Sequence, residues 1–138
     1  MAPAGLSVEL VAALFVENID MRPVPGPSTR IDLGGVFFST PAETFPCTLT
    51  PHLVVLVRST PDGPANGTLV CEFERDGEQV ARNAQFVAIE PGKFAYRLVR
   101  PELEFTEPGT ILATCSLVET GSSITVPLTV LAPVGDSA

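Results

Sequence analysis

The only histidine of this sequence, His52, lies five residues after Cys47. A thiol beside an imidazole is the smallest set of groups that makes a nucleophile with its general base. A reactive thiol also needs a polarising environment, which neither residue shows in its sequence neighbourhood. No G-x-S-x-G motif presents a serine to this histidine. An enzyme that uses His52 with a cysteine or a carboxylate is therefore the least favoured of three functional hypotheses.

Two pairs of glutamates occur in which the members are two residues apart. In a strand this spacing places both carboxylates of a pair on the same face, about 7 Å apart. Such pairs serve glycoside chemistry or bind a hard cation. Solvated strand faces produce the same spacing, and a sequence with no Trp and one Tyr lacks aromatic platforms for a sugar. Arg97 and Arg100 precede the second pair; an anion site and exposed ion pairs are the two interpretations, and the ion pairs are favoured. The pairs are Glu72 with Glu74 and Glu102 with Glu104.

The three cysteines, Cys47, Cys71 and Cys115, are too far apart in sequence for a zinc site, so no metal and no cofactor is expected. We expect them to be buried, reduced thiols that pack as small apolar groups. A Cys71–Cys115 bridge between two sheets would suit a secreted sandwich. In a reducing cytoplasm it is not expected.

The composition describes an acidic, foldable chain. Of 138 residues, 45% are hydrophobic and 17% are charged, which predicts one packed domain over 1–138, with an ordered core of about 8–131 and a flexible tail over 132–138. A net charge of −8 argues against nucleic-acid partners and anionic membrane surfaces. With neither a basic leader nor an apolar run of about 18 residues, we expect a cytoplasmic protein.

Fourteen prolines, about twice the usual share, divide the sequence into short segments rich in Val, Leu, Phe, Ile and Thr. Their alternating patterns predict an antiparallel two-sheet β-sandwich of seven to nine strands, with a small β-barrel as the alternative. A short helix is the competitor for the first segment. The predicted strands are Val8–Asp20, Thr29–Phe38, His52–Thr60, Thr68–Arg75, Glu78–Ile89, Phe94–Val99, Thr110–Val118 and Ile124–Leu131, and Leu103 with Phe105 leads into the seventh.

Glycine and proline mark particular positions within these segments. Asp76-Gly77 predicts a tight hairpin turn, because both residues tolerate positive φ. The pair Gly34-Gly35 inside a strand predicts a bulge rather than a ligand contact. Pro127 predicts an edge position or a bulge, and 22–28, 61–67, 91–92 and 120–122 are expected to be loops or turns.

Several segments together resemble an uncharacterised bacterial family of small proteins. They are Leu14-Phe15-Val16-Glu17, Ile31-Asp32-Leu33-Gly34-Gly35-Val36-Phe37, Leu103-Glu104-Phe105-Thr106-Glu107-Pro108-Gly109 and Val126-Pro127-Leu128-Thr129-Val130. The resemblance implies an immunoglobulin-like β-sandwich in a cytoplasmic bacterial protein. The family has no assigned activity, so no catalytic residue carries over.

The strand His52–Thr60 does not alternate in polarity. Its centre, Leu53-Val54-Val55-Leu56-Val57, is apolar on both faces, which indicates either a covered central strand or a strand at a subunit contact. In an open sandwich Val54 and Leu56 would point outward, unless a loop such as 22–28 covers them. We therefore predict these five residues as a contact surface of an oligomer.

The leading functional hypothesis is a non-catalytic protein-interaction module that self-associates or packs into a larger assembly. The alternative is a small-molecule carrier with an apolar pocket between the sheets. That pocket would be lined by Phe15, Phe37, Phe73 and Phe86.

Overall fold

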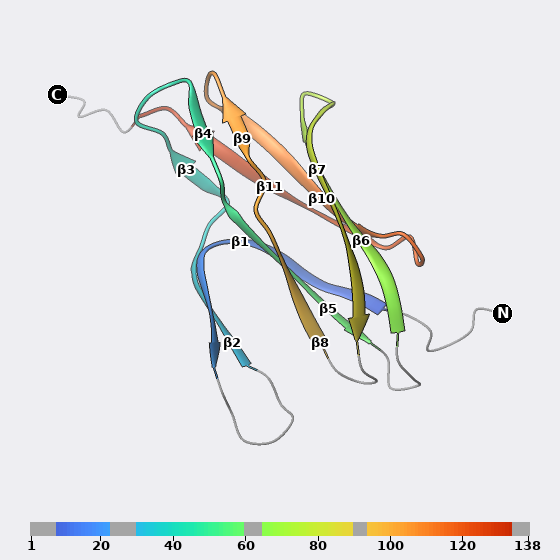
Figure 1. The fold of residues 1–138 in the computed structure, drawn as a ribbon. Helices are drawn as coiled ribbons and strands as arrows, with labels where there is room; N and C mark the ends of the chain where they lie inside the picture. The colour runs from blue at the N-terminus through green and yellow to red at the C-terminus, as the bar shows by residue number, and fades with distance from the viewer. Residues whose placement is uncertain (1–7, 23–29, 60–64, 90–93, 134–138) are drawn as a thin grey trace.

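The computed structural model describes residues 8–22, 30–59, 65–89 and 94–133. Within these residues the regular secondary structure consists of β-strands (Figure 1). Two large sheets and one small sheet form a sandwich, which confirms the predicted all-β class. None of the sheets formed by the described residues closes on itself, so the barrel alternative is wrong. The helical alternative for the first segment is also wrong, because Val8–Arg22 is strand β1. No helix in the described residues is long and apolar enough to cross a membrane.

Eleven strands, rather than seven to nine, occupy the described residues. They are β1 (Val8–Arg22), β2 (Arg30–Val36), β3 (Ser39–Pro41), β4 (Cys47–Leu49), β5 (His52–Ser59), β6 (Ala65–Arg75), β7 (Glu78–Ile89), β8 (Phe94–Val99), β9 (Leu103–Phe105), β10 (Gly109–Leu117) and β11 (Ser123–Leu131). The short strands β3 and β4 were not predicted from the sequence, because three residues are too few for a visible alternation.

The strand order divides the chain between the sheets. The first sheet has the order β2-β1-β5-β8, the second has the order β3-β11-β10-β6-β7, and β4 pairs with β9 in the small sheet. The pair β3–β11 is parallel, so the second sheet is mixed rather than wholly antiparallel. Strands β1, β5 and β8 lie in one sheet and β6, β7, β10 and β11 in the other, a division of the kind found in immunoglobulin-like sandwiches.

Alternate side chains of the two large sheets form one core. Its largest completely buried members are Phe15, Phe73 and Phe105. Phe37 is partly buried against this core, with its ring centroid 6.3 Å from that of Phe15. Full burial of such a side chain stabilises the fold by about 1.5–3 kcal/mol relative to exposure.

A bulge in β1 interrupts the alternation that the sequence suggests. The pairing of β1 with β5 shifts between Leu10 and Ala12, which leaves Val11 52% exposed. Leu10 packs against the core before the shift, and Ala13 and Phe15 lie in the core after it. A regular alternation would place Leu10 on the face of Ala12, Leu14 and Val16, and the extra residue moves it to the other side.

The Gly34-Gly35 pair lies within β2 without a bulge. The register with β1 is the same on both sides of the pair, with Val16 opposite Val36 and Asn18 opposite Gly34, so no residue is inserted. Gly35 instead has a φ of +66°, and a Cβ there would lie 2.2 Å from the Glu17 carboxylate oxygen. The predicted bulge is wrong, and glycine is needed for its positive φ and for the close approach of Glu17.

The other turn predictions have different outcomes. Asp76 and Gly77 have φ of 54° and 81°, which confirms the hairpin turn between β6 and β7. A turn also forms at Gly121, whose N–H donates to the Leu117 carbonyl at 2.8 Å. Pro127 lies in β11 opposite Leu112, on the half of that strand which β3 does not cover, so it occupies a local edge. Two loop predictions are wrong at their ends, because Arg22 is the last residue of β1 and β6 begins at Ala65. The rest of the predicted loops at 22–28 and 61–67, the turn at 91–92 and most of the tail at 132–138 lie outside the described residues.

Candidate functional site

Strand β7 forms one edge of the five-stranded sheet, and β6 is its only neighbour there among the described strands. The Val118 N–H donates to the Thr68 carbonyl at 3.1 Å, which shows that the even-numbered residues of β6 bond toward β10. The odd-numbered residues of β6 therefore bond to β7, where Asn83 pairs with Cys71 and Gln85 pairs with Leu69. It follows that Ala84, Phe86 and Ala88 direct their N–H and C=O groups away from the sheet.

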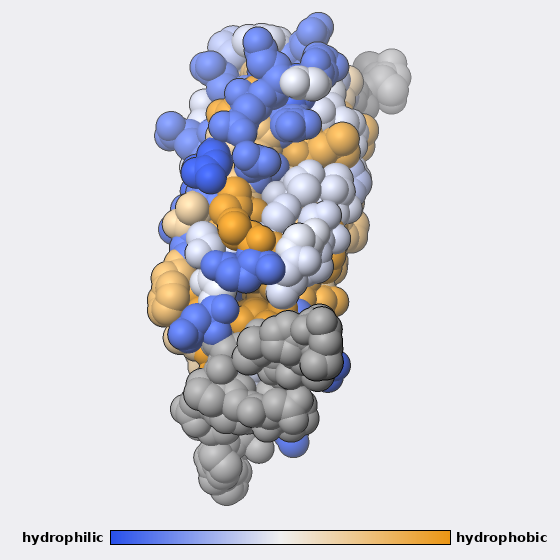
Figure 2. All heavy atoms as spheres, turned by 90° about the vertical axis from the view of Figure 1, so that its right-hand side faces the viewer, coloured by the Kyte–Doolittle hydropathy of each residue, from blue (hydrophilic) through white to orange (hydrophobic). Residues whose placement is uncertain are grey.

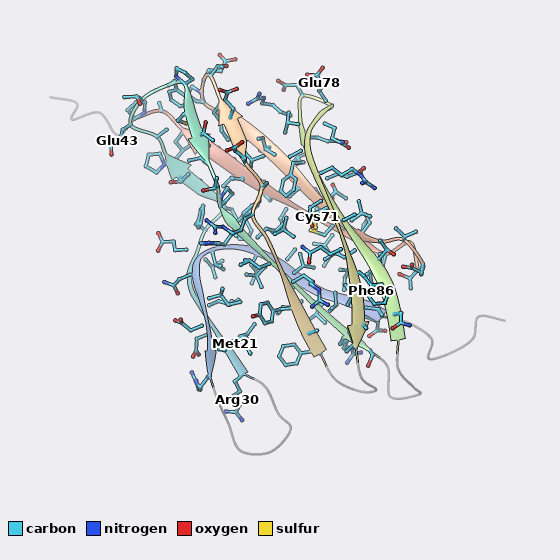
Figure 3. The ribbon with its side chains drawn as sticks, in the orientation of Figure 1. Met21, Arg30, Glu43, Cys71, Glu78 and Phe86 are labelled. Carbon is cyan, nitrogen blue, oxygen red and sulfur yellow. The ribbon has the colours of Figure 1, made fainter. Side chains whose placement is uncertain are left out.

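The side chains of this edge row are apolar and exposed. Phe86 is 65% exposed, the largest fraction among the exposed large hydrophobic residues described, and Ala84 and Ala88 are exposed as well. Their neighbours Val87 and Ile89 are buried in the core. Figure 3 shows Phe86 at the side of the molecule and Cys71 nearer its centre. The edge row thus combines free backbone groups with an unburied aromatic ring.

Side chains from β7 and β8 close the gap between the two sheets along this edge. Arg97 of β8 donates from Nη2 to the Phe86 carbonyl at 3.3 Å and from Nη1 to the Tyr96 carbonyl at 2.9 Å. Gln85 donates from Nε2 to the Leu98 carbonyl at 3.4 Å. Within the described residues, Arg97 is the only group that hydrogen-bonds to the outward backbone row of Ala84, Phe86 and Ala88.

The charge around β7 differs from that of the whole chain. From Ala81 to Ile89 the strand carries Arg82 and no carboxylate, although the chain has a net charge of −8. Arg82 lies 3.6 Å from the Glu72 carboxylate in an exposed ion pair, which contributes about 0–1 kcal/mol. Figure 2, which faces the right-hand side of Figure 1, shows hydrophilic side chains gathered at the end with the β6–β7 turn, and hydrophobic and near-neutral atoms further along.

The predicted contact residues of β5 lie in the interior of one chain. Strand β5 is placed between β1 and β8, and Val54 lies in register between Leu14 and Leu98, which flank it on the outer face. The expectation that Val54 and Leu56 project from an open face is therefore wrong for Val54 and only partly right for Leu56, which is half-buried. The completely buried members of the predicted set are Leu53, Val54, Val55 and Val57.

The four phenylalanines of the predicted pocket are separated by the fold. Phe15 and Phe73 fill the core, Phe37 packs beside Phe15, and Phe86 lies on the opposite face of its strand. The sequence does contain a signal for the outward position of Phe86. Neighbouring residues of a strand point to opposite faces, so Phe86 and its neighbour Val87, which is buried, cannot both face the core. The predicted pocket with these four rings is wrong.

The residues singled out for chemistry are not assembled into one site. In the described part of the chain, the His52 side chain has no hydrogen-bond or ion-pair partner, and no group of three His, Cys, Asp or Glu side chains is arranged to hold a metal. Glu72 pairs with Arg82, while Arg75 donates to the Glu104 carbonyl at 2.9 Å and stacks over Phe105. Neither Arg97 nor Arg100 forms an ion pair with a described residue, so the ion-pair interpretation is wrong for both. A hollow of about 340 Å³ lies beside Arg82 and Arg100; its other lining residues are Phe73, Ala81, Asn83, Val99, Pro101 and Glu102.

Comparison with known proteins adds no relative: no protein-family model matches this chain, and no curated protein matches it. The resemblance to a bacterial immunoglobulin-like family therefore stays a prediction from the sequence.

Proposed function

We propose that this chain is a non-catalytic interaction module that self-associates through the free edge of β7. The observation that carries the proposal is Phe86, a 65% exposed aromatic side chain on an edge strand whose outward backbone groups have almost no hydrogen-bond partner among the described residues. Proteins usually protect such an edge with Pro, Lys or a bulge. From Ala81 to Ile89, β7 has neither Pro nor Lys, and its irregularity lies before Ala81.

A second copy of the chain is the occupant that best suits this edge. An antiparallel pairing about a two-fold axis at Ala84 places Ala84 opposite Ala84 of the second copy, and Arg82 opposite Phe86 of the second copy. All three residues direct their backbone groups outward, so they can form hydrogen-bonded pairs. The arginine and the ring can form a cation–π contact twice, once in each direction.

Charge supports the same occupant. Two chains with a net charge of −8 repel each other over most of their surfaces, and β7 offers a stretch from Ala81 to Ile89 without a carboxylate. Arg97 would leave the Phe86 carbonyl when a strand is added. Its hydrogen bond of 3.3 Å is longer than the usual 2.9–3.0 Å, and the new backbone bond would replace it.

Light scattering over a micromolar-to-millimolar concentration series tests the proposal. We expect the mass to rise from 14.5 kDa toward twice that value. Phe86→Glu should weaken association about 10- to 100-fold, because burial of a Phe contributes about 1.5–3 kcal/mol. Ala84→Pro should also abolish dimerisation, because proline removes an outward N–H that the chain itself does not use. Both variants should keep a β spectrum in circular dichroism.

Leu112→Glu is the matched control. Leu112 is 45% exposed in β10, two strands away from the β7 edge, so its change should leave the mass series unaltered. A wild-type chain that stays a monomer throughout the series would contradict the proposal. So would a Leu112→Glu effect as large as that of Phe86→Glu, since that result would place the contact on the sheet face.

A further inference from the structure

The only two thiols in the sandwich core are cross-strand neighbours. Cys71 of β6 lies directly opposite Cys115 of β10, both are completely buried, and their Sγ atoms are 3.5 Å apart. A bridge between them would join two strands of one sheet and not two sheets, because β6 and β10 belong to the same sheet. The third cysteine, Cys47, is partly buried in β4 of the small sheet.

The hydrogen-bonding pattern between β6 and β10 places this pair at a position suited to a covalent bond. Because Val118 and Thr68 form a hydrogen-bonded pair, Cys115 and Cys71, three residues along each strand, form a non-hydrogen-bonded pair. Cα atoms at such positions lie about 4.5 Å apart, within the range of about 4.4–6.8 Å that disulfides span. The backbone hydrogen bonds of Cys71 run to β7 and those of Cys115 to β11, so linking the two sulfurs breaks no bond of the ladder.

The hydrogen bond between the two thiols makes them unequal. The Cys71 S–H donates to Cys115 Sγ, and this hydrogen bond lowers the pKa of Cys115, against the effect of burial. The same bond, together with burial, raises the pKa of Cys71. Cys115 is therefore the sulfur that loses its proton first, with Cys71 beside it as the resolving thiol.

We propose that Cys71 and Cys115 are a covalent modification site, at which a small peroxide converts the pair into a disulfide within one sheet. The Cys115 thiolate attacks one peroxide oxygen, the O–O bond breaks, and a sulfenic acid and hydroxide form. Cys71 then attacks the sulfenic sulfur, the S–S bond forms, and the S–O bond breaks with release of water. Overall, two thiols are oxidised and, with hydrogen peroxide, one peroxide is reduced; the hydroxide takes up the proton that Cys115 lost, so two waters form.

The modification would link two hairpins covalently. Strand β6 belongs to the β6–β7 hairpin and β10 belongs to the β10–β11 hairpin, and the two meet at the centre of the five-stranded sheet. Since both sulfurs are completely buried, the oxidant reaches them when the sheet opens locally. The site is independent of the β7 edge, because both side chains point into the core.

The test treats the full native chain with hydrogen peroxide, quenches it, alkylates remaining thiols under denaturing conditions and measures intact and peptide masses. We expect one alkylatable thiol, at Cys47, and a crosslinked peptide pair containing Cys71 and Cys115. The mass before alkylation should fall by two hydrogens and recover with a reducing agent. Sub-denaturing urea should accelerate the reaction.

Cys47→Ser is the matched control and should oxidise in the same way. Cys71→Ala and Cys115→Ala should each lose the two-hydrogen change, and either variant suffices if the other fails to fold. Three alkylatable thiols after treatment would overturn the proposal. A disulfide to Cys47, a disulfide between chains, or oxygen addition without a crosslink would overturn it as well.

Discussion

Strands β5 and β7 differ in their position within a sheet, and this position decides whether a strand is accessible to a partner. Strand β5 has a run of five apolar residues, and the fold gives it a neighbour on each side and buries four of the five completely. Strand β7 alternates, with Val87 buried and Phe86 65% exposed, and the fold leaves one of its sides free. The more hydrophobic strand is the less accessible one.

This difference separates hydrophobicity from exposure. An unbroken apolar run shows that both faces of a strand are covered, and it does not say whether a partner or the same chain covers them. In β5 the chain itself provides the cover, with Leu14 and Leu98 beside Val54. Exposure in a sheet depends on lateral position, and an edge strand keeps free backbone groups whatever its side chains are.

The largest expected difference between the two strands is in the stability lost when one side chain of each is replaced by alanine. Leu53→Ala removes a completely buried side chain and leaves a cavity, so we expect a loss of about 2–5 kcal/mol in the free energy of unfolding. Phe86→Ala removes an exposed ring and should cost less than about 0.5 kcal/mol. Urea unfolding of both variants measures the difference, and equal losses would show that Phe86 packs against its own chain.

Proline substitutions at two adjacent residues of β7, made one at a time, should distinguish the side of the strand that pairs with β6 from the free side. Gln85→Pro removes an N–H that bonds to β6 and leaves a carbonyl of Leu69 without its donor, which should cost about 1–3 kcal/mol. Ala84→Pro removes an outward N–H and should cost less. Thermal unfolding ranks the two, and a greater loss for Ala84→Pro would reverse the assignment of the free side.

The smallest expected effect on stability concerns Thr68 of β6, which lies opposite Phe86 of β7. Glu119 accepts hydrogen bonds from the N–H of Thr68 at 2.8 Å and from its hydroxyl at 3.2 Å, and the Thr68 N–H holds the pKa of this carboxyl below its ordinary value of 4.5. A carboxyl with a lowered pKa stabilises the fold above its unfolded pKa, and this contribution disappears as the pH falls through the folded pKa.

Glu119→Gln should therefore be slightly less stable than the natural chain at neutral pH, and the gap should close as the solution is acidified below about pH 4.5. Unfolding measured at several pH values gives this difference. A gap that widens on acidification would mean that the carboxyl is not held ionised by Thr68.

Much of the fold follows from local signals in the sequence. The strand Glu78–Ile89 has the predicted bounds, because Asp76-Gly77 supplies the positive φ of the turn and the segment contains no proline. The candidate site was not predicted, although Phe86 stands next to Val87 in an alternating strand and one of them has to face outward. The bulge after Leu10 was not predicted either, because an inserted residue leaves the composition of β1 unchanged.

The sequence by itself determined that this chain forms β-strands, where most of the longer ones begin and end, and two of the turns that join them, because proline, glycine and alternation act over a few residues. Only the tertiary structure decided that β5 is enclosed and β7 is an edge, since sheet order depends on contacts between distant segments. The same reason applies to the thiols. Cys71 and Cys115 are 44 residues apart in the chain, and the β6–β10 register alone brings their sulfurs into contact.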